Sequence, residues 1–230
     1  MKVISIHQPN YLPWIGYFYK IVSADTFVFL DNVDYQYGNS SSVTNKAKIK
    51  TNSGVQLLSV PVKKTKGLRF IKEMPVDNGQ PWQRKHLNSI KLTYCKSPFF
   101  EPVFELLEGT LNSKTELLAT LNETLIANIC NYLLIPTNLV KASDLSIEQE
   151  DRNIRLIEIC KKLNGDIYLS GNGGKKYNNA TLFNEKGIEI KYTEFVHPTY
   201  NQLHGTFIPN LSVIDMLFME GSKLSLIKGN

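Results

Sequence analysis

Hydrophobic and polar positions follow two different periods along the chain, and each change of period marks a predicted strand or helix. Residues 2–6 and 26–33 are short apolar runs rich in β-branched and aromatic side chains, which is typical of buried strands. Residues 16–24, which lie between these runs, have their apolar positions at helical spacing. This order of strand, helix and strand predicts a βαβ unit with parallel strands and a right-handed connection.

The middle of the chain changes to helical periodicity. The segments with this pattern are 82–94, 99–111 and 114–135. The last of them stops before Pro136, because proline cannot continue a helix. Residues 36–54, which precede the helices, are polar and end in a predicted hairpin, and residues 55–62 are a further strand candidate. We therefore expect a helical insertion over about residues 81–135.

The last third of the chain repeats the alternation of strands and helices. It contains predicted strands at 137–143, 166–171 and 188–195, and predicted helices at 150–165, 181–187 and 212–221. No internal repeat, low-complexity linker or break in composition divides the sequence. Residues 1–230 are thus predicted to form a single α/β domain. Its sheet should be mainly parallel or mixed, with helices on both faces.

Composition limits the class of protein. The chain has 230 residues, of which 42% are hydrophobic and 20% charged, as in globular proteins. Its net charge of +5 suits an anionic small molecule, but no dense Lys/Arg stripe indicates nucleic acid. The sequence contains neither a long apolar run nor a signal-peptide pattern, so no membrane span or secretion is expected. Its three cysteines form no Cys-x-x-Cys pair, which indicates reduced thiols in the cytoplasm. A homo-oligomer is left open.

Candidate chemistry lies where the first two strands end, the edge at which parallel sheets bind ligands. His7 ends the first strand and Asp31 ends the second, so the carboxylate could orient the imidazole as a general base. These two residues are the candidate catalytic pair. The alternatives are a histidine bonded to backbone and an aspartate that caps a loop. The candidate substrate-binding residues of the same segment are Gln8, Asn10, Tyr11, Trp14 and Tyr17. Trp14 either stacks on a sugar or base ring or fills the core under the first helix.

Two further segments are candidates for phosphate binding. Lys46 follows Asn45 on a strand-like pattern, and Lys48 and Lys50 on the same face are expected to be solvated edge residues. Residues 170–177, SGNGGKKY, can present backbone N–H groups to an oxyanion, although the Walker spacing is absent and a mobile turn is the alternative. The candidate substrate-binding residues here are Asn45, Lys46, Ser170, Gly171 and Tyr177.

The segment VHPTYNQLHG, residues 196–205, contains two histidines seven positions apart. The sequence places no third ligand beside them, so we predict no metal site. The candidate substrate-binding residues of this segment are His197, Tyr200 and Gln202.

Several blocks of sequence occur in a characteristic order between residues 4 and 221. They read IHQPNYLPWIGYFYKI, ADTFVFLDNVDY, NKAKIK, KHLNSIKLTYCKSPFF, YLSGNGGKKY, VHPTYNQ and LSVIDMLFMEG. In these blocks the chain resembles the WbqC-like family of bacterial surface-polysaccharide (O-antigen) gene clusters. The resemblance implies a cytoplasmic enzyme that modifies a nucleotide-linked amino sugar by acyl or aminoacyl transfer, with an activated acyl or aminoacyl donor. The chain departs from the family pattern at Tyr37-Gly38, where relatives carry a basic pair, and at Lys46, where arginine is usual.

The turn Trp14-Ile15-Gly16-Tyr17 also resembles, more weakly, the HxGH turn of HIGH-type nucleotidylyltransferases, although both histidines are replaced. This resemblance implies an alternative function, an adenylate-forming or nucleotidyl-transferring enzyme that uses ATP and magnesium. A third alternative is a sugar-nucleotide-binding or scaffold protein without turnover.

Overall fold

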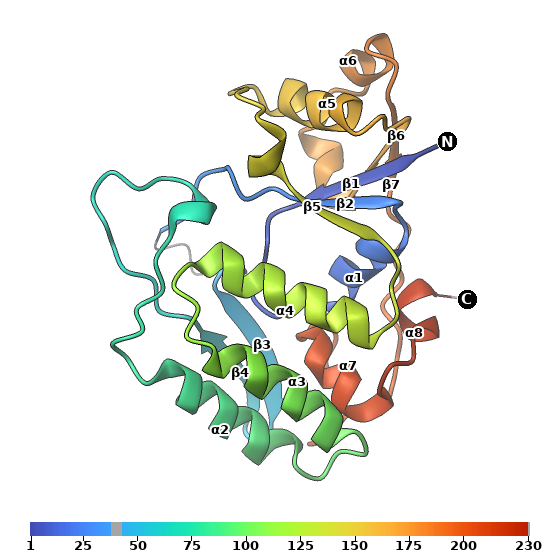
Figure 1. The fold of residues 1–230 in the computed structure, drawn as a ribbon. Helices are drawn as coiled ribbons and strands as arrows, with labels where there is room; N and C mark the ends of the chain where they lie inside the picture. Colours follow the sequence, from blue (N-terminus) through green and yellow to red (C-terminus); the bar gives the residue numbers. More distant parts are fainter. Residues whose placement is uncertain (38–42, 230) are drawn as a thin grey trace.

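A parallel sheet lies in the upper half of the molecule as drawn in Figure 1. The computed structural model describes residues 1–37 and 43–229. The strands of the sheet are β1 (Val3–His7), β2 (Thr26–Phe29), β5 (Asn138–Lys141), β6 (Ile167–Ser170) and β7 (Glu189–Tyr192). They lie in the order β5-β2-β1-β6-β7, and every neighbouring pair is parallel. The predicted first βαβ unit is confirmed, because β1 pairs with β2 directly.

Helices cover both faces of this sheet. On one face lie α1 (Ile15–Val22) and α4 (Leu118–Tyr132), and on the other lie α5 (Arg152–Lys162) and α6 (Ala180–Glu185) (Figure 1). Alternation along the strands explains the two layers. Phe27 and Phe29 pack into the cluster that contains α1 and α4, whereas Val28 packs with α5. The predicted single α/β domain with helices on both faces is therefore confirmed.

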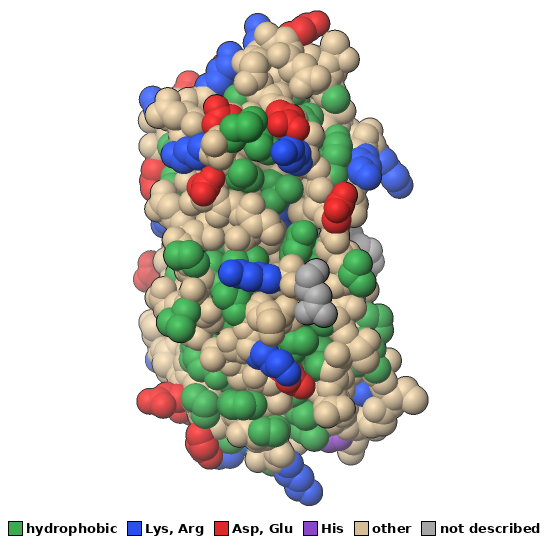
Figure 2. Space-filling view, turned by 90° about the vertical axis from the view of Figure 1, so that its right-hand side faces the viewer, with side chains coloured by type: hydrophobic (Ala, Val, Ile, Leu, Met, Phe, Trp, Pro, Cys, Tyr) green, Lys and Arg blue, Asp and Glu red, His purple; other side chains and the backbone are tan. Residues whose placement is uncertain are grey.

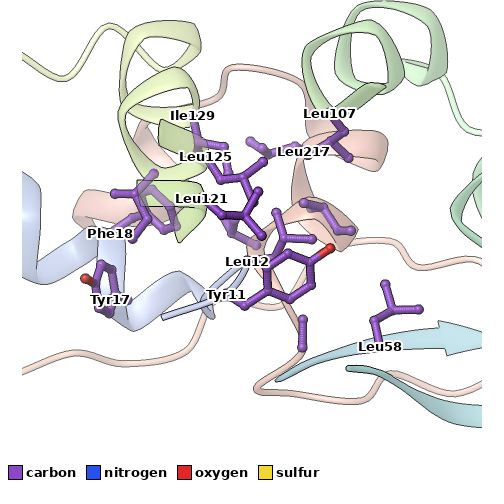
Figure 3. Close-up of a cluster of buried hydrophobic side chains, with 14 of the residues drawn as sticks. Tyr11, Leu12, Tyr17, Phe18, Leu58, Leu107, Leu121, Leu125, Ile129 and Leu217 are labelled. Carbon is purple, nitrogen blue, oxygen red and sulfur yellow. The ribbon is translucent and has the colours of Figure 1, made fainter. Parts of the chain in front are cut away.

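The helical insertion and the ends of the chain complete the larger core. The insertion contains α2 (Trp82–Tyr94), α3 (Phe100–Asn112) and α4, and beside it lies the hairpin β3 (Lys46–Thr51) and β4 (Gly54–Ser59). The C-terminal helices are α7 (Val213–Glu220) and α8 (Ser225–Lys228), and the short 3-10 helices are η1 (Ile71–Glu73), η2 (Ala142–Leu145) and η3 (Asn172–Lys176). Figure 3 shows leucines of α4 between Phe18 of α1 on one side and Leu107 of α3 and Leu217 of α7 on the other. This cluster fixes α1 under the sheet.

One predicted surface residue lies in the interior. Lys50 was expected to be a solvated edge lysine, but only 2% of it is exposed. Its ammonium donates to the carbonyls of Gly205 (3.2 Å) and Thr206 (2.5 Å) and to Oε1 of Gln202 (3.2 Å). The expectation was wrong because the C-terminal loop covers this end of the hairpin, which the local pattern could not reveal.

The surface has no single dominant charge on the face shown in Figure 2. There Lys and Arg side chains are interspersed with Asp and Glu. No helix among residues 1–37 and 43–229 combines the length and apolarity that a bilayer crossing requires. The resemblance of the first βαβ unit to HIGH-type enzymes stays a prediction.

Candidate functional site

The sheet divides at the carboxyl end of its central strand. Pairing between β1 and β2 continues to His7 and Phe29, whereas pairing between β1 and β6 ends at Ser5 and Leu169. Numbered by their order along the chain, the strands of this sheet stand in the order 3-2-1-4-5. The second and third strands therefore lie on one side of β1, and the fourth and fifth lie on the other side. Ligands of doubly wound sheets bind at such a switch point.

A cavity of about 560 Å³ opens at this division, and we call it the switch-point cavity. Its polar lining includes His7 at the end of β1, Gln8 after it, Lys20 of α1, Arg152 and Arg155 of α5, Ser170 at the end of β6 and the glycines that follow. Among the described residues that line it there is no carboxylate. Two arginines and the protonated form of Lys20 thus face one cavity whose described lining contains no carboxylate, an arrangement suited to an anionic ligand.

Lys20 closes the gap where β6 stops pairing with β1. Its ammonium donates to the carbonyl of Ile6 at 2.6 Å, and only 5% of the residue is exposed. Burial, and next the charge of Arg152, lowers the pKa of Lys20 from 10.5 to about 7. Near neutral pH part of the population therefore carries a free amine that can accept a proton.

His7 and Asp31 do not form the predicted hydrogen bond. The Asp31 carboxylate instead accepts from the backbone N–H of Ser143 (2.9 Å) and from the Ser143 hydroxyl (2.6 Å), which is the loop-capping alternative. The His7 ring contacts Tyr17, with ring centroids 5.0 Å apart. Burial, and secondarily Lys20, lowers the pKa of His7 from 6.5 to about 3, so its imidazole is neutral but weakly basic at pH 7.

Helix α5 begins at the cavity with basic residues in its first turn. Asp151 caps the helix by accepting from the N–H of Ile154 at 2.8 Å. The Arg152 guanidinium lies 5.0 Å from the centre of the Tyr177 ring, and Arg155 Nε donates to the carbonyl of Gln149 at 2.6 Å. The helix N-terminus adds its partial positive charge to that of the two arginines.

The glycine-rich segment after β6 folds into η3 on the opposite wall. The Ser170 hydroxyl donates to the carbonyl of Gly171 (3.2 Å) and accepts from Asn178 Nδ2 (2.9 Å). The first N–H groups of a helix have no acceptor within that helix, so those at the start of η3 can serve an anion. The structure thus brings the candidates His7, Gln8, Ser170, Gly171 and Tyr177, which come from two separate segments, together at one cavity. Their roles in binding stay a prediction.

Two glycines of this segment give a matched test. A Cβ on Gly174 would lie 2.2 Å from Ser170 Oγ, whereas a Cβ on Gly173 would meet nothing within 4 Å. We expect Gly174→Ala to lower the free energy of unfolding by about 1–3 kcal/mol through overpacking and to weaken binding of inorganic pyrophosphate. Gly173→Ala should leave both unchanged. Urea unfolding and calorimetry measure the two effects. Equal behaviour of the two variants would contradict the binding of an anion by the segment after β6.

Two other predicted residues of the first turn line a different cavity. Asn10 and Trp14 face a space of about 470 Å³, together with Lys46 and Lys48 of β3 and the 210–212 segment. We call this space the second cavity. The expectation of one pocket shared by His7, Asn10, Tyr11, Trp14 and Asp31 is therefore wrong, because the segment between His7 and Trp14 turns away from the switch point.

Tyr11 and Tyr17 are packed in the core, where Figure 3 shows them. The hydroxyl of Tyr11 pairs with His86 Nδ1 at 2.9 Å, and that of Tyr17 donates to the carbonyl of Gln8 at 2.9 Å. Asn45 also bonds internally, from Nδ2 to the carbonyl of Val60 at 2.9 Å. These three side chains hold the walls in place.

The C-terminal candidates form an internal network. The Tyr200 hydroxyl donates to the buried Asp215 carboxylate at 3.0 Å, and Gln202 Nε2 donates to the carbonyl of Ile208 at 2.9 Å. His197 Nε2 accepts from the N–H of Asn210 at 3.1 Å. The three candidates are absent from the described lining of both cavities. At the Tyr37-Gly38 position, Gly38 lies outside the described residues.

Sequence reasoning missed the three cations of the switch-point cavity. Two signals could have found them. Lys20 is a charged residue in the otherwise apolar and aromatic sequence of α1, IGYFYKIV. Arg152 and Arg155 stand at the positive end of a helix, where cations are electrostatically unfavourable. A basic residue in either setting lowers the stability of the fold, and an anionic ligand can offset this loss.

Two comparisons relate the chain to known proteins. Residues 8–225 match the model of the WbqC-like protein family. The chain is also 32% identical, over 228 residues, to an uncharacterized protein of Mycobacterium tuberculosis. That alignment covers 97% of this chain and 96% of the mycobacterial protein.

Proposed function

The chain belongs to the WbqC-like protein family, and from this premise we propose that it is a cytoplasmic transferase of surface-glycan biosynthesis. Its substrate would be a nucleotide-linked amino sugar, with the diphosphate held in the switch-point cavity. One observation supports this most strongly. Arg152 and Arg155 line the cavity, and none of its described lining residues is acidic. A diphosphate supplies the negative charge that this group lacks.

The three walls of the cavity would have different tasks. Arg152 and Arg155 offer planar guanidinium groups, which can bind phosphate oxygens with two hydrogen bonds each. The N-terminus of α5 and the backbone after Gly171 supply N–H donors. Val33, Leu30 and the Tyr177 ring form an apolar border against which a sugar or base can pack.

The reaction we propose is acyl or aminoacyl transfer to the sugar amine. The amine nitrogen attacks the carbonyl carbon of an activated donor, so a C–N bond forms. The bond to the donor's leaving group then breaks, and the leaving group departs with the electron pair. The proton released by the amine passes to the Lys20 amine. Lys20 suits this task better than His7, because its pKa of about 7 lies closer to the working pH.

The test is an assay of the whole chain with UDP- and dTDP-amino sugars and acyl or aminoacyl donors. Mass spectrometry should detect a sugar nucleotide heavier by the acyl group, formed equally in the presence of EDTA. Magnesium-dependent release of pyrophosphate from ATP would overturn this function in favour of adenylate formation. Sugar-nucleotide binding without any product would also refute the transferase function and would favour a non-catalytic binding protein.

A further inference from the structure

The second cavity contains a buried polar atom without a partner. Asn10 is only 3% exposed, yet its Oδ1 makes no hydrogen bond with any described residue. A buried carbonyl oxygen left without a donor is costly, and such atoms in folded proteins call for an explanation. Asn10 lines the cavity, so rotation of its side-chain amide could present Oδ1 to a ligand that carries an O–H or N–H group.

An aromatic surface lies beside this atom. Trp14 is 37% exposed and also lines the cavity. Its six-membered ring lies over Gly16, where a Cβ would come within 2.2 Å of the ring, and it makes a T-shaped contact with Phe195, with ring centroids 5.4 Å apart. The indole is therefore held in place by a glycine and by a second aromatic ring. Its exposed part offers a flat apolar surface of the kind on which rings stack.

Backbone hydrogen bonds hold these side chains in place. The Tyr11 N–H donates to the carbonyl of Thr44 at 3.1 Å, and the Val213 N–H donates to the carbonyl of Pro13 at 2.8 Å. The Asn122 side chain donates to the carbonyls of Pro9 (2.9 Å) and Thr44 (2.7 Å). The segment that carries Asn10 and Trp14 is thus fixed from both sides. A site of this kind is pre-organised, so a ligand does not have to order it.

We propose that the second cavity is a separate binding site for a pyranose ring. The apolar face of the ring lies on Trp14, and one of its hydroxyl or amide N–H groups donates to Asn10 Oδ1. Lys48, Asn210 and Ser212 at the border provide further hydrogen-bonding groups for a polyhydroxylated ring. A nucleobase offers them fewer hydrogen-bonding groups. The site extends the proposed function by a second carbohydrate, but it rests on its own observations and not on the switch-point cavity.

The test uses N-acetylglucosamine as the probe and uridine as the competing ring. Saturation-transfer NMR and tryptophan fluorescence follow binding to the full chain. Of the two tryptophans, Trp82 is only 4% exposed, so a change in emission reports mainly on Trp14. We expect saturable binding of the sugar and none of uridine. Absence of sugar binding, or preferential binding of uridine, would overturn the site.

Variants separate recognition from folding. Asn10→Leu should weaken sugar binding by about tenfold or more, with an unchanged or higher melting temperature, because it removes an unpaired buried oxygen. Asn122→Leu should instead lower the melting temperature, since it removes two backbone contacts. Trp14→Phe keeps an aromatic ring at the cavity wall but reduces its flat surface, and should also weaken binding. If folded Trp14→Phe and Asn10→Leu both bind like the wild type, the proposal is wrong. Arg152→Ala should keep sugar binding, which distinguishes failure here from failure at the switch point.

Discussion

Lys20→Met is expected to abolish transfer and to make the protein more stable below pH 7. Lys20 is buried at the division of the sheet, where burial and the charge of Arg152 lower its pKa to about 7. The charged form is therefore costly inside the fold. Methionine has a similar length without the charge, but it leaves the Ile6 carbonyl unpaired, which offsets about 1–3 kcal/mol of the gain. We expect a net increase of about 1–2 kcal/mol in the free energy of unfolding at pH 6.

The pH dependence of this effect has a definite sign. Lys20 titrates near 7 in the folded protein and near 10.5 in the unfolded chain, so the unfolded chain binds more protons between these values. The wild type must then gain stability as the pH rises from 7 to 10.5. The advantage of Lys20→Met should shrink over this range and reverse above it, where only the lost hydrogen bond remains. Denaturant unfolding at several pH values measures the curve.

Controls separate the charge of Lys20 from its chemistry. Lys20→Arg keeps a cation but cannot release its proton at neutral pH, so it should retain sugar-nucleotide binding and lose transfer by about 100-fold or more. Lys223→Met removes an exposed lysine paired with Glu220 and should change little. Full activity in Lys20→Arg would show that Lys20 is not the proton acceptor.

The second large effect is expected at the start of α5. Arg152→Ala and Arg155→Ala should each weaken binding of a UDP-sugar by about 10- to 100-fold, because each removes a charge-assisted contact to phosphate. The loss should be smaller at high salt, where screening already weakens the attraction. Arg152→Ala should not destabilise the fold, because it removes a cation from the positive end of a helix.

Calorimetry at low and high salt measures both arginine effects, and Arg84→Ala in α2 is the control. Arg84 is also exposed but lies outside the described lining of the switch-point cavity, so its removal should leave affinity unchanged. Equal affinities for wild type and Arg152→Ala at low salt would remove the arginine from the site. An equal loss in Arg84→Ala would indicate attraction by net charge alone.

The order of strands and helices was determined by the sequence itself. Period-two and helical patterns depend on neighbouring residues, so the runs at 2–6 and 26–33, the helical insertion and the glycine-rich segment after β6 were all found. The rule that parallel strands bind ligands at their carboxyl ends pointed to the end of β1, and His7 there does line a cavity; Ser170 of β6 lies at the same cavity, although β1 and β6 lie far apart in the chain.

Only the tertiary structure decided which polar side chains share a cavity. Asp31 follows its strand as expected, but Ser143, from a distant segment, takes its hydrogen bonds. Lys50 alternates like an edge residue, yet the C-terminal loop buries it. Lys20 of α1 and Arg152 of α5 come from helices on opposite faces of the sheet. They line one cavity only because β1 and β6 separate at that point. Local pattern fixes the face on which a residue lies, whereas its partners and its pKa depend on segments more than a hundred residues away.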